Sequence, residues 1–423
     1  MEASDNLHVD QTASELTEEP CYFLALPTEL ILRICDFLDS DIVIEVLGKV
    51  CEFFAVLAAD DLIWKTRIHK RWPNKRYPLR QVDAMFDWKQ ACMEREREYR
   101  RWTDISNHIN RTDIPFGFCV DVVHITSSNH LIMGLRDHTL YSIKLSDIPM
   151  PEQSELGDGD VVRDVDTLRL SGLGGRETFQ RVAHKGWIWT ISSDEEKICS
   201  GSWDSKVLLW DYAGQQLSLY KCGSAVLCST MTGNEILAGT FNKTLVKIDT
   251  RVASPVSTIL IPRRPILCVE ETPNWAIIGN ESRQINIMDK KTLKIYSTLR
   301  LPAGFPRSMS LKDNLLYVGT KSGIHVYSFD EALGRLTFLE TFSEDQNTEA
   351  RIVKHTLGSV LTAYKDGICK IWEPSGKPAV LQTVTSQNSE EICSMDYRNG
   401  SLVLGSVGCV SLYRDKPPVH HDT

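Results

Sequence analysis

The chain of 423 residues repeats one pattern seven times along most of its length. In each copy a small residue ends a segment of alternating polar and apolar positions, a turn follows, and a second segment closes on an apolar or aromatic residue. Five of the six spacings between the small residues lie between 38 and 44 residues. Repeats of about 40 residues with this alternation predict β-strands arranged as the blades of a propeller. The small residues are Gly134, Gly201, Gly239, Gly279, Gly319, Ala363 and Gly405.

The second copy is the most complete, with His184, Ser200, Asp204 and Trp210 at the positions of a full WD repeat. This resemblance implies a structural network in which the aspartate accepts a hydrogen bond from the histidine and the indole N–H donates to the serine hydroxyl. A Ser, His and Asp set also fits nucleophilic catalysis. No G-x-S-x-G sequence accompanies it, so we favour the structural network and keep catalysis as the alternative.

Turn lengths and chain ends give three further expectations. The turns at 319–323 and 405–408 are one residue short, which predicts tight turns that depend on glycine. Only about ten residues follow Tyr413, so a strand at roughly 102–110 is expected to complete the last blade and leave no open edge. The longest spacing, 67 residues, contains an acidic and Gly-rich run at 149–175, which predicts an exposed inserted loop.

Residues 26–64 have a helical character instead. The segment 26–29 places a proline and an acid where a helix begins. Three short helices are predicted, but about forty residues cannot bury a full core alone. The unit should therefore leave apolar surface that another chain covers. Its apolar positions are Leu30, Ile34, Phe37, Leu38, Ile42, Val43, Val46, Leu47, Val50, Cys51, Phe54, Leu57, Leu62 and Trp64.

This helical stretch resembles the F-box, with Phe54 where a tryptophan is usual and Phe53 where a basic residue is common. Together with the repeats, the chain resembles the F-box/WD-repeat proteins over nearly its whole length. The resemblance implies an all-β seven-bladed WD-repeat β-propeller preceded by a small all-α F-box and a helical linker. The expected boundaries are 1–20 for a disordered acidic tail, 21–67 for the F-box, 68–109 for the linker and propeller-closing segment, 110–415 for the propeller and 416–423 for a flexible C-terminus.

The family resemblance implies a non-catalytic substrate receptor of an SCF-type cullin-RING ubiquitin ligase. Its F-box would dock on the Skp adaptor, and through it on the cullin and the RING subunit, while the propeller would hold a protein target for ubiquitination. One alternative is a scaffold that binds partners through the propeller without directing their degradation; another is a helical unit that only caps its own propeller. The residues implied for adaptor binding are Leu26, Pro27, Leu30, Ile34, Leu38, Leu47, Val50 and Cys51.

In WD propellers the usual contact surface is the face that carries the Asp turns and the loops leading into each inner strand. Aromatic residues on this face gather in the second and third repeats and basic residues in the fifth and sixth. This predicts a target segment with an apolar anchor and a negative group such as a phosphate; the alternative is that these are ordinary loop residues. The candidates are Arg136, Lys185, Trp187, Trp203, Phe241, Arg264, Arg307, Lys321, Arg351 and Lys365.

Between the two regions, residues 86–102 predict a helix about 25 Å long. Trp88, Cys92, Tyr99 and Trp102 recur near helical spacing, which favours packing on the propeller over a cofactor site. The alternating charges at 94–98 favour a solvated face. A basic run at 65–80 is interpreted as solvated surface or adaptor contact.

Composition restricts the other function classes. Lys and Arg number 47 against 56 Asp and Glu, a net charge of −9, which argues against nucleic acid as a partner. No apolar run reaches 18 residues and no signal-peptide pattern opens the chain, so we expect an intracellular protein, cytoplasmic or nuclear, without membrane attachment. The twelve cysteines form no C-x-x-C pair and are predicted to be buried reduced thiols. No P-loop or H-E-x-x-H motif occurs, and no cofactor or metal is expected.

Overall fold

The structure, a computed structural model, describes residues 26–80, 86–149, 179–342 and 349–416. The chain divides into two compact units, residues 1–67 and 68–423. The predicted acidic tail lies outside the described residues. So do the predicted inserted loop and the predicted flexible C-terminus, apart from their end residues Pro149 and Lys416.

The first unit is helical, as expected, but the details differ from the prediction. It contains α1 (Thr28–Cys35), α2 (Glu52–Ala59) and the start of α3 (Asp61–Arg71), which continues into the second unit. The predicted second helix is instead a π-helical turn (Ile42–Val46) followed by a 3₁₀ turn (Leu47–Lys49). Four β-branched residues stand in the π-helical turn, and such side chains restrict χ1 in a helix.

The core of the first unit is small and is closed by two polar side chains of α3. The Trp64 indole nitrogen donates to Ala58 O at 3.0 Å. The Arg67 guanidinium donates to Cys35 O at 2.7 Å and to Leu38 O, so it satisfies the last carbonyl group of α1 and one in the segment that follows it. Arg67 is buried, which makes the prediction of a solvated or adaptor-facing side chain wrong for this residue. The buried apolar side chains are Ile31, Cys35, Val43, Phe54, Leu57, Ala58 and Trp64.

The second unit begins with the end of α3 and continues through α4 (Trp88–Thr103) and α5 (Ile105–His108). Helix α4 confirms the helix predicted at 86–102, and the Asp87 side chain caps it by accepting from Gln90 N at 2.8 Å. The predicted solvated face of α4 is wrong. Four charged side chains of this helix are buried: Arg95, Glu96, Glu98 and Arg101.

These buried charges are tolerated because each has a partner close by. The Arg95 guanidinium lies 4.2 Å from the ring centroids of both Trp72 and Tyr77, a cation–π arrangement. Glu96 forms an ion pair with Arg71, with 2.7 Å between Oε1 and Nη1. The alternation of charges along the sequence therefore reflects internal pairing and not solvation.

Helix α4 packs on one face of the propeller through Glu98. Its carboxylate accepts from the Trp102 indole nitrogen at 2.7 Å, from Ser359 Oγ at 2.8 Å and from the Tyr397 hydroxyl. Arg101 donates to the same Tyr397 hydroxyl at 2.7 Å and pairs with Asp415 at 2.7 Å. The helix is thus joined to the turn between β21 and β22 and to the ends of β25 and β26.

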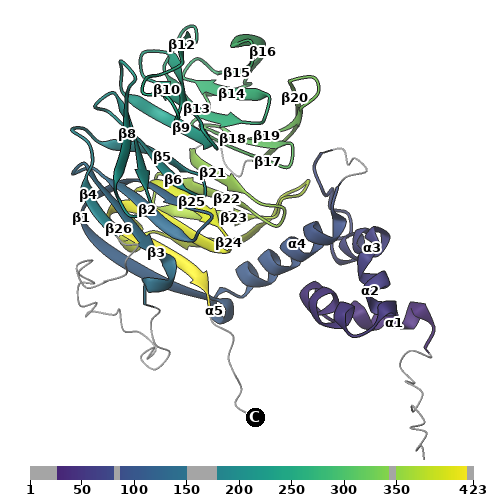
Figure 1. Ribbon diagram of the computed structural model, residues 1–423. Helices are drawn as coiled ribbons and strands as arrows, with labels where there is room; N and C mark the ends of the chain where they lie inside the picture. Colours follow the sequence, from purple (N-terminus) through teal and green to yellow (C-terminus); the bar gives the residue numbers. More distant parts are fainter. Residues whose placement is uncertain (1–25, 81–85, 150–178, 343–348, 417–423) are drawn as a thin grey trace, which may run out of the picture. The chain divides into compact units, whose positions relative to one another are not determined.

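The described residues of the propeller form six hydrogen-bonded sheets, five with four strands and one with six. Figure 1 shows their arrangement. All neighbouring strands in these sheets are antiparallel. Each four-stranded sheet is made of four consecutive strands. The first two sheets contain β5 (Ile188–Ser193), β6 (Lys197–Ser202), β7 (Lys206–Asp211) and β8 (Gln216–Lys221), and β9 (Val226–Thr232), β10 (Glu235–Thr240), β11 (Thr244–Asp249) and β12 (Ser257–Leu260). The other three contain β13 (Ile266–Glu271), β14 (Trp275–Asn280), β15 (Gln284–Asp289) and β16 (Lys294–Arg300); β17 (Ser308–Lys312), β18 (Leu315–Thr320), β19 (Gly323–Asp330) and β20 (Arg335–Phe342); and β21 (Ala350–His355), β22 (Val360–Tyr364), β23 (Ile368–Trp372) and β24 (Val380–Thr385).

The six-stranded sheet joins the two ends of the propeller. It contains β1 (Ile109–Ile125), β2 (His130–Leu135), β3 (Thr139–Lys144), β4 (Phe179–Val182), β25 (Ile392–Arg398) and β26 (Ser401–Asp415).

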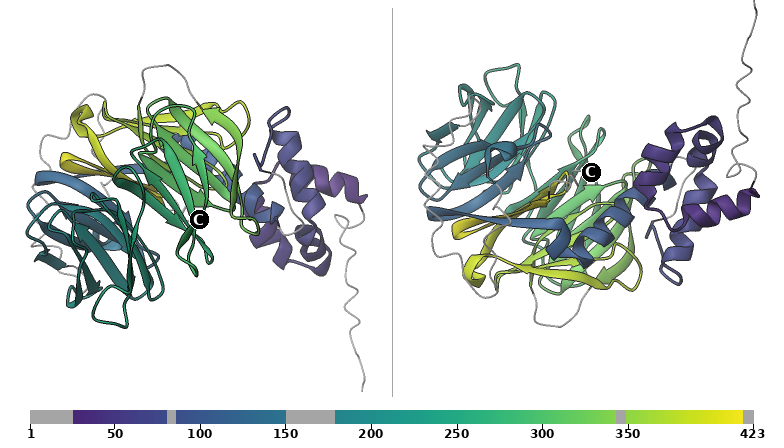
Figure 2. Two further views of the ribbon diagram at one scale, coloured as in Figure 1. Left: turned by 90° about the horizontal axis from the view of Figure 1, so that it is seen from above. Right: turned by 90° about the horizontal axis from the view of Figure 1, so that it is seen from below.

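Two long strands make this joint, and each pairs in two halves. Residues 109–115 of β1 pair with 409–415 of β26, whereas residues 120–125 of β1 pair with β2. Residues 401–406 of β26 pair with β25. The blue β1 and the yellow β26 lie side by side in Figure 1 and in both views of Figure 2.

The prediction of a propeller is confirmed. Six separate sheets are present among the described residues where seven blades were predicted. The seven marker residues do lie on seven strands, β2, β6, β10, β14, β18, β22 and β26, but the first and last repeats merge into one sheet. Closure by the chain segment ahead of the repeats is also confirmed. Its position at 102–110 was wrong, because residues up to His108 are helical and the strand begins at Ile109.

Close packing between neighbouring repeats explains the small marker residues. A Cβ on Gly134 would lie 2.7 Å from Ile188 Cγ2, and one on Gly201 would lie 2.7 Å from Val226 Cγ1. Both contacts are made with the first residue of the next repeat's inner strand. A separate requirement applies in the two short turns, where Gly323 and Gly408 have φ of 118° and 77°, so the predicted dependence on glycine is confirmed.

Acidification is expected to destabilise the propeller through His355, which is buried against the Tyr317 ring at 4.3 Å and the Ser310 hydroxyl at 2.9 Å. Burial lowers the pKa of His355 to about 3. Below an ordinary histidine pKa of about 6.5, this histidine binds a proton in the unfolded chain but not in the folded chain. The free energy of unfolding therefore decreases by about 1.4 kcal/mol for each unit by which the pH is lowered.

Between pH 6.5 and pH 5 this difference amounts to about 2 kcal/mol. Urea unfolding at both pH values measures how much unfolding free energy is lost on acidification. This loss should be smaller in a His355→Gln variant than in the wild type by about 2 kcal/mol. The exposed His69, changed to Gln, serves as the control. An equal loss in the wild type and in His355→Gln would contradict the expectation.

Candidate functional site

The four predicted residues of the WD network lie together in the second repeat. His184 Nδ1 is 3.2 Å from both carboxylate oxygens of Asp204, and its Nε2 is 2.9 Å from Ser200 Oγ. The Trp210 indole nitrogen donates to Ser200 Oγ at 2.9 Å. Burial lowers the pKa of His184 below its ordinary value, against the opposing effect of Asp204. Ser200 is fully buried, so its hydroxyl cannot meet a substrate, and the arrangement locks the turn of this repeat.

One face of the propeller is built from equivalent positions of successive repeats. Arg136, Trp203 and Phe241 each directly follow the second strand of a repeat. Their backbone N–H groups donate to Cys119 O, Trp187 O and Ala225 O at 2.9 to 3.0 Å. Because each bond fixes the turn against the segment leading into the inner strand, these side chains emerge on the same face.

Four aromatic side chains form a continuous exposed cluster on this face. We call Trp187, Trp189, Trp203 and Phe241 the aromatic cluster. The Trp203 ring centroid lies 6.2 Å from Trp187, 5.9 Å from Trp189 and 6.1 Å from Phe241. The four residues are between 39% and 53% exposed. Contiguous exposed apolar surface of this kind marks interaction sites, and aromatic side chains dominate the binding energy of many interfaces.

Arg136 extends the aromatic cluster toward the first repeat. Its guanidinium lies 4.9 Å from the Trp187 ring centroid. It also donates to both oxygens of Asp121, from Nη2 to Oδ1 at 2.7 Å and from Nε to Oδ2 at 3.2 Å. This bidentate hydrogen bonding to Asp121 raises the pKa of Arg136 above its ordinary value. The arginine is therefore held in place over the ring, with its charge largely balanced by Asp121.

Six inner strands carry a β-bulge at the same face, and each bulge turns one residue toward the centre. The register shifts fall at equivalent places in β1, β5, β9, β13, β21 and β25. All six bulge residues line a central cavity of about 550 Å³. Bulges are typical of positions where a strand re-aims a side chain at a site. The bulge residues are Asp121, Trp189, Leu227, Leu267, Arg351 and Cys393.

Trp189 is the member of the aromatic cluster that the sequence prediction missed. Trp189 lies inside β5, where the alternation of side chains along a strand gives no sign that it is exposed on the same propeller face as Trp187 and Trp203. The bulge between Ile188 and Thr190 breaks that alternation. The clustering of three tryptophans within 17 residues was the only available signal in the sequence.

Three of the predicted basic residues, Arg136, Arg307 and Arg351, line the central cavity, and each is paired with a carboxylate. Arg307 pairs with Glu349, and Arg351 pairs with Glu391. Arg264 is exposed and lies 3.9 Å from Glu281. Lys185, Lys321 and Lys365 are exposed on loops of three different repeats. The two arginines proposed to bind a phosphate therefore already have carboxylate partners.

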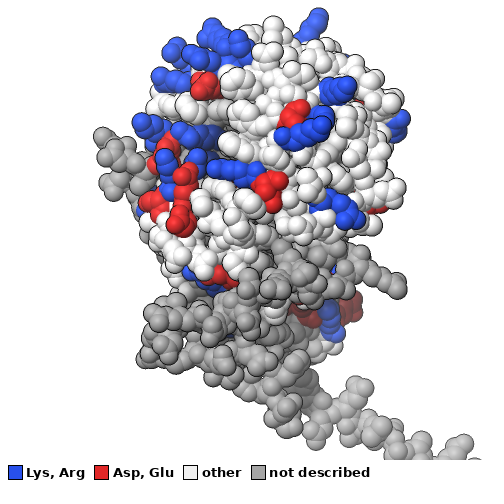
Figure 3. All heavy atoms as spheres, turned by 90° about the vertical axis from the view of Figure 1, so that its left-hand side faces the viewer, with Lys and Arg blue, Asp and Glu red and all other residues white. Residues whose placement is uncertain are grey.

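On the side of the molecule seen in Figure 3, the Lys and Arg side chains of the described residues lie interspersed with Asp and Glu between broad uncharged areas. Such a mixture differs from the continuous basic surface that nucleic acid requires. Within the described part of the chain, no helix combines the length and the apolar character needed to cross a bilayer.

In the first unit, helix α1 turns one apolar edge outward. Ile31 is 1% exposed, whereas Leu30 and Ile34 on the neighbouring edge are 45% and 39% exposed. Of the other residues predicted to bind an adaptor, Leu26, Pro27 and Val50 are exposed, and Leu38, Leu47 and Cys51 are half-buried. The exposed large apolar side chains of this unit are Leu26, Leu30, Ile34, Phe37, Ile42, Val46, Val50, Phe53, Val56 and Leu62. This number is high for a unit with so few buried apolar residues, and it indicates a surface for a partner.

Comparisons with known proteins agree with both units. Residues 176–211 match the family model of the WD domain, G-beta repeat. The chain is 28% identical to F-box/WD repeat-containing protein 9 of Bos taurus and 26% identical to that of Homo sapiens; each match covers 92% of this chain and 81% of the relative. It is 24% identical to F-box/WD repeat-containing protein mec-15 of Caenorhabditis elegans, over 80% of this chain and 81% of the relative.

A solved structure supports the fold alone. The β-propeller domain of Cps50 (Swd1) from Myceliophteria thermophila matches with a TM-score of 0.59 at 14% identity, over 71% of this chain and 98% of that domain.

Proposed function

We propose that this chain, a relative of the F-box/WD repeat proteins along nearly its whole length, is a substrate receptor of an SCF-type cullin-RING ubiquitin ligase. The observation that carries the proposal is the exposed apolar surface of the first unit. A small helical unit with this surface needs a partner chain to cover it. The Skp adaptor is the partner that the family resemblance implies, with cullin and the RING subunit bound through it.

Adaptor binding would use the outward edge of α1 and the segment that follows the π-helical and 3₁₀ turns. Leu26, Pro27, Leu30 and Ile34 supply the first part of this surface, and Val50 supplies the second. Apolar side chains that are exposed in the free chain and covered in a complex contribute favourably by about 25 cal/mol for each Å² removed from water. The half-buried Leu38, Leu47 and Cys51 would support this surface from below.

The aromatic cluster is the proposed anchor for the target protein. Backbone hydrogen bonds fix the turns that carry Trp203 and Phe241, and the rings contact one another, so little conformational entropy is lost when a partner covers them. An apolar target segment fits this surface. A phosphate on the target is no longer favoured, because Arg307 and Arg351 are already paired with glutamates.

The receptor would perform no chemistry itself. The predicted set of Ser200, His184 and Asp204 has a fully buried hydroxyl that the Trp210 indole also engages. The rival function is a scaffold that binds partners through the propeller without directing ubiquitin transfer. The expected location is intracellular, in the cytoplasm, the nucleus or both.

The first test separates these two functions. The full chain and a Leu26→Ala, Pro27→Ala variant are compared for co-purification of the Skp adaptor and cullin, and proteins held by the propeller are followed for ubiquitination and half-life. A receptor recovers both partners, loses them in the variant, and shortens the half-life of its target. Recovery of the target with an unchanged half-life would favour the scaffold.

Trp203→Ala is expected to weaken target binding at least tenfold, because Trp203 contacts the other three members of the aromatic cluster. Quantitative mass spectrometry of proteins recovered with the wild type and with the variant measures this loss. Phe338→Ala, which removes an exposed aromatic residue from outer strand β20, is the matched control. Equal recovery by wild type and Trp203→Ala would show that the target binds elsewhere.

A further inference from the structure

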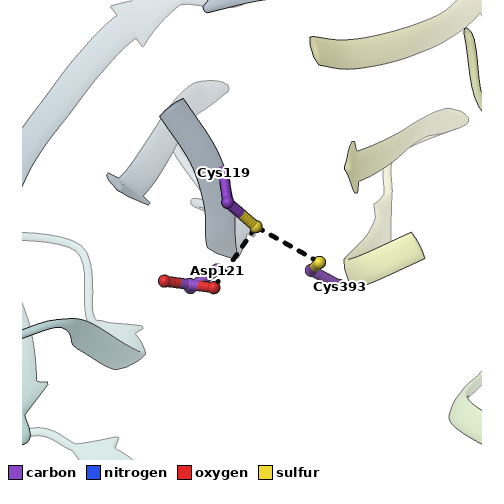
Figure 4. A group of neighbouring side chains, drawn as sticks. All are labelled: Cys119, Asp121 and Cys393. Carbon is purple, nitrogen blue, oxygen red and sulfur yellow. Dashed lines mark hydrogen bonds between the residues drawn. The ribbon is translucent and has the colours of Figure 1, made fainter. Parts of the chain in front are cut away.

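Two thiols and one carboxylate meet where the first and last repeats join, as Figure 4 shows. Cys119 Sγ lies 3.3 Å from Cys393 Sγ and 3.4 Å from Asp121 Oδ1. The three potential ligand atoms all lie within 4.8 Å of one another. Cys119 and Asp121 belong to β1 and Cys393 to β25, so residues far apart in sequence converge because the ring closes.

The backbone directs these three side chains toward one another. Asp121 and Cys393 are the bulge residues of adjacent inner strands, and both line the central cavity. Cys119 is buried behind them at the point where β1 changes its pairing partner from β26 to β2. A group bound between the three atoms would therefore have protein on one side and the cavity on the other.

The ligand chemistry fits a divalent cation that favours sulfur. Two thiolates and one carboxylate carry three negative charges, and Arg136, which pairs with Asp121, contributes one positive charge. The net charge of the group is then about −2, which balances the charge of a divalent cation. Cysteine thiolates and carboxylate oxygens are both ligands of Zn²⁺, and three protein ligands with a fourth position open to solvent is a common arrangement.

Arg136 also takes a role that is common around metal ligands. It donates to both oxygens of Asp121 and so fixes the orientation of the carboxylate. Hydrogen-bonding partners of this kind orient the residues that bind a metal. Asp121 Oδ1 also faces the Cys119 thiol, whose proton a cation would replace.

We propose that Cys119, Asp121 and Cys393 form a binding site for a thiophilic divalent cation, with Zn²⁺ as the natural candidate. Binding releases the two thiol protons and links β1 to β25 through the ion. Because Asp121 also holds Arg136 against Trp187, the ion lies next to the aromatic cluster. The proposal does not depend on a role in ubiquitin transfer. It replaces the sequence-based expectation of buried reduced thiols without a metal at these two cysteines.

The test uses the full chain, freed of metal by a chelator and kept reduced with a phosphine that does not itself supply a thiol. Cd²⁺ is titrated as a spectroscopic probe and Zn²⁺ in competition with it. We expect one ion per chain, with a thiolate-to-cadmium absorption band, and at least a tenfold weaker affinity in Cys119→Ser and in Cys393→Ser. Saturating Zn²⁺ should raise the Tm of the wild type but not that of Cys119→Ser or Cys393→Ser.

A matched control is Cys228→Ser, which removes another thiol of the same cavity outside the trio and should bind like the wild type. Asp121→Asn should weaken binding while preserving the thiolate band. The proposal is overturned if the wild type gives no thiolate band, or if Cys393→Ser and the wild type bind Cd²⁺ equally.

Discussion

An Ile34→Glu variant is expected to lose at least a hundredfold in affinity for the Skp adaptor while its propeller stays folded. Ile34 lies on the outward edge of α1, where an adaptor would cover it. A glutamate there would lose apolar contact and would be buried in the complex without a paired charge. A loss of about 3 kcal/mol in binding free energy corresponds to a factor of more than one hundred. Titration calorimetry of the purified adaptor with the full chain measures it.

The matched control for this variant is Arg33→Ala, which changes an exposed residue of the same helix. Because Ile34 is already exposed in the free chain, its replacement should change the Tm little. Adaptor affinity that stays within a factor of two in Ile34→Glu would exclude this edge of α1 as the docking surface. The helical unit would then be better explained as a cap.

A Glu98→Leu variant is expected to lose about 3–5 kcal/mol of unfolding free energy, the cost typical of removing one partner from a buried ion pair. Glu98 is the shared acceptor for Trp102, Ser359 and Tyr397, and Arg101 lies 3.6 Å away. Leucine would fill the space but would leave three buried donors and one buried cation without this acceptor. Urea unfolding of the second unit, followed by tryptophan fluorescence, gives the loss.

Two variants separate charge from hydrogen bonding at this position. Glu98→Gln keeps one carbonyl acceptor and should lose less than Glu98→Leu. Arg97→Leu alters an exposed side chain of the same helix and should change the unfolding free energy by less than about 0.5 kcal/mol. A loss below about 1 kcal/mol in Glu98→Leu would mean that Glu98 contributes little to holding α4 on the propeller.

Sequence reasoning succeeded where a residue's role depends on its immediate neighbours. The spacing of Gly134, Gly201 and their equivalents predicts stacked repeats, because only a small side chain fits against the next inner strand. The glycines of the two short turns have the positive φ that was expected.

It failed where partners come from distant parts of the chain. The alternating charges of α4 predicted a solvated face, yet Arg95 and Glu98 are buried. Their partners, Tyr77 and Ser359, come from other segments of the chain. Trp189 was missed because a single bulge reverses the direction of its side chain.

The sequence by itself determined the repeat period, the propeller class, the helical first unit and the small residues that close packing demands, because each follows from local periodicity and local sterics. Only the tertiary structure decided that the first and last repeats share one sheet, that Arg307 and Arg351 are paired, and that Cys119, Asp121 and Cys393 converge. The shared sheet and the Cys119, Asp121 and Cys393 group arise from ring closure, which brings together residues more than 250 positions apart, and from β-bulges, which change a side chain's direction without leaving a mark in the pattern of residues. The two arginines are paired because glutamates of the neighbouring repeat lie beside them.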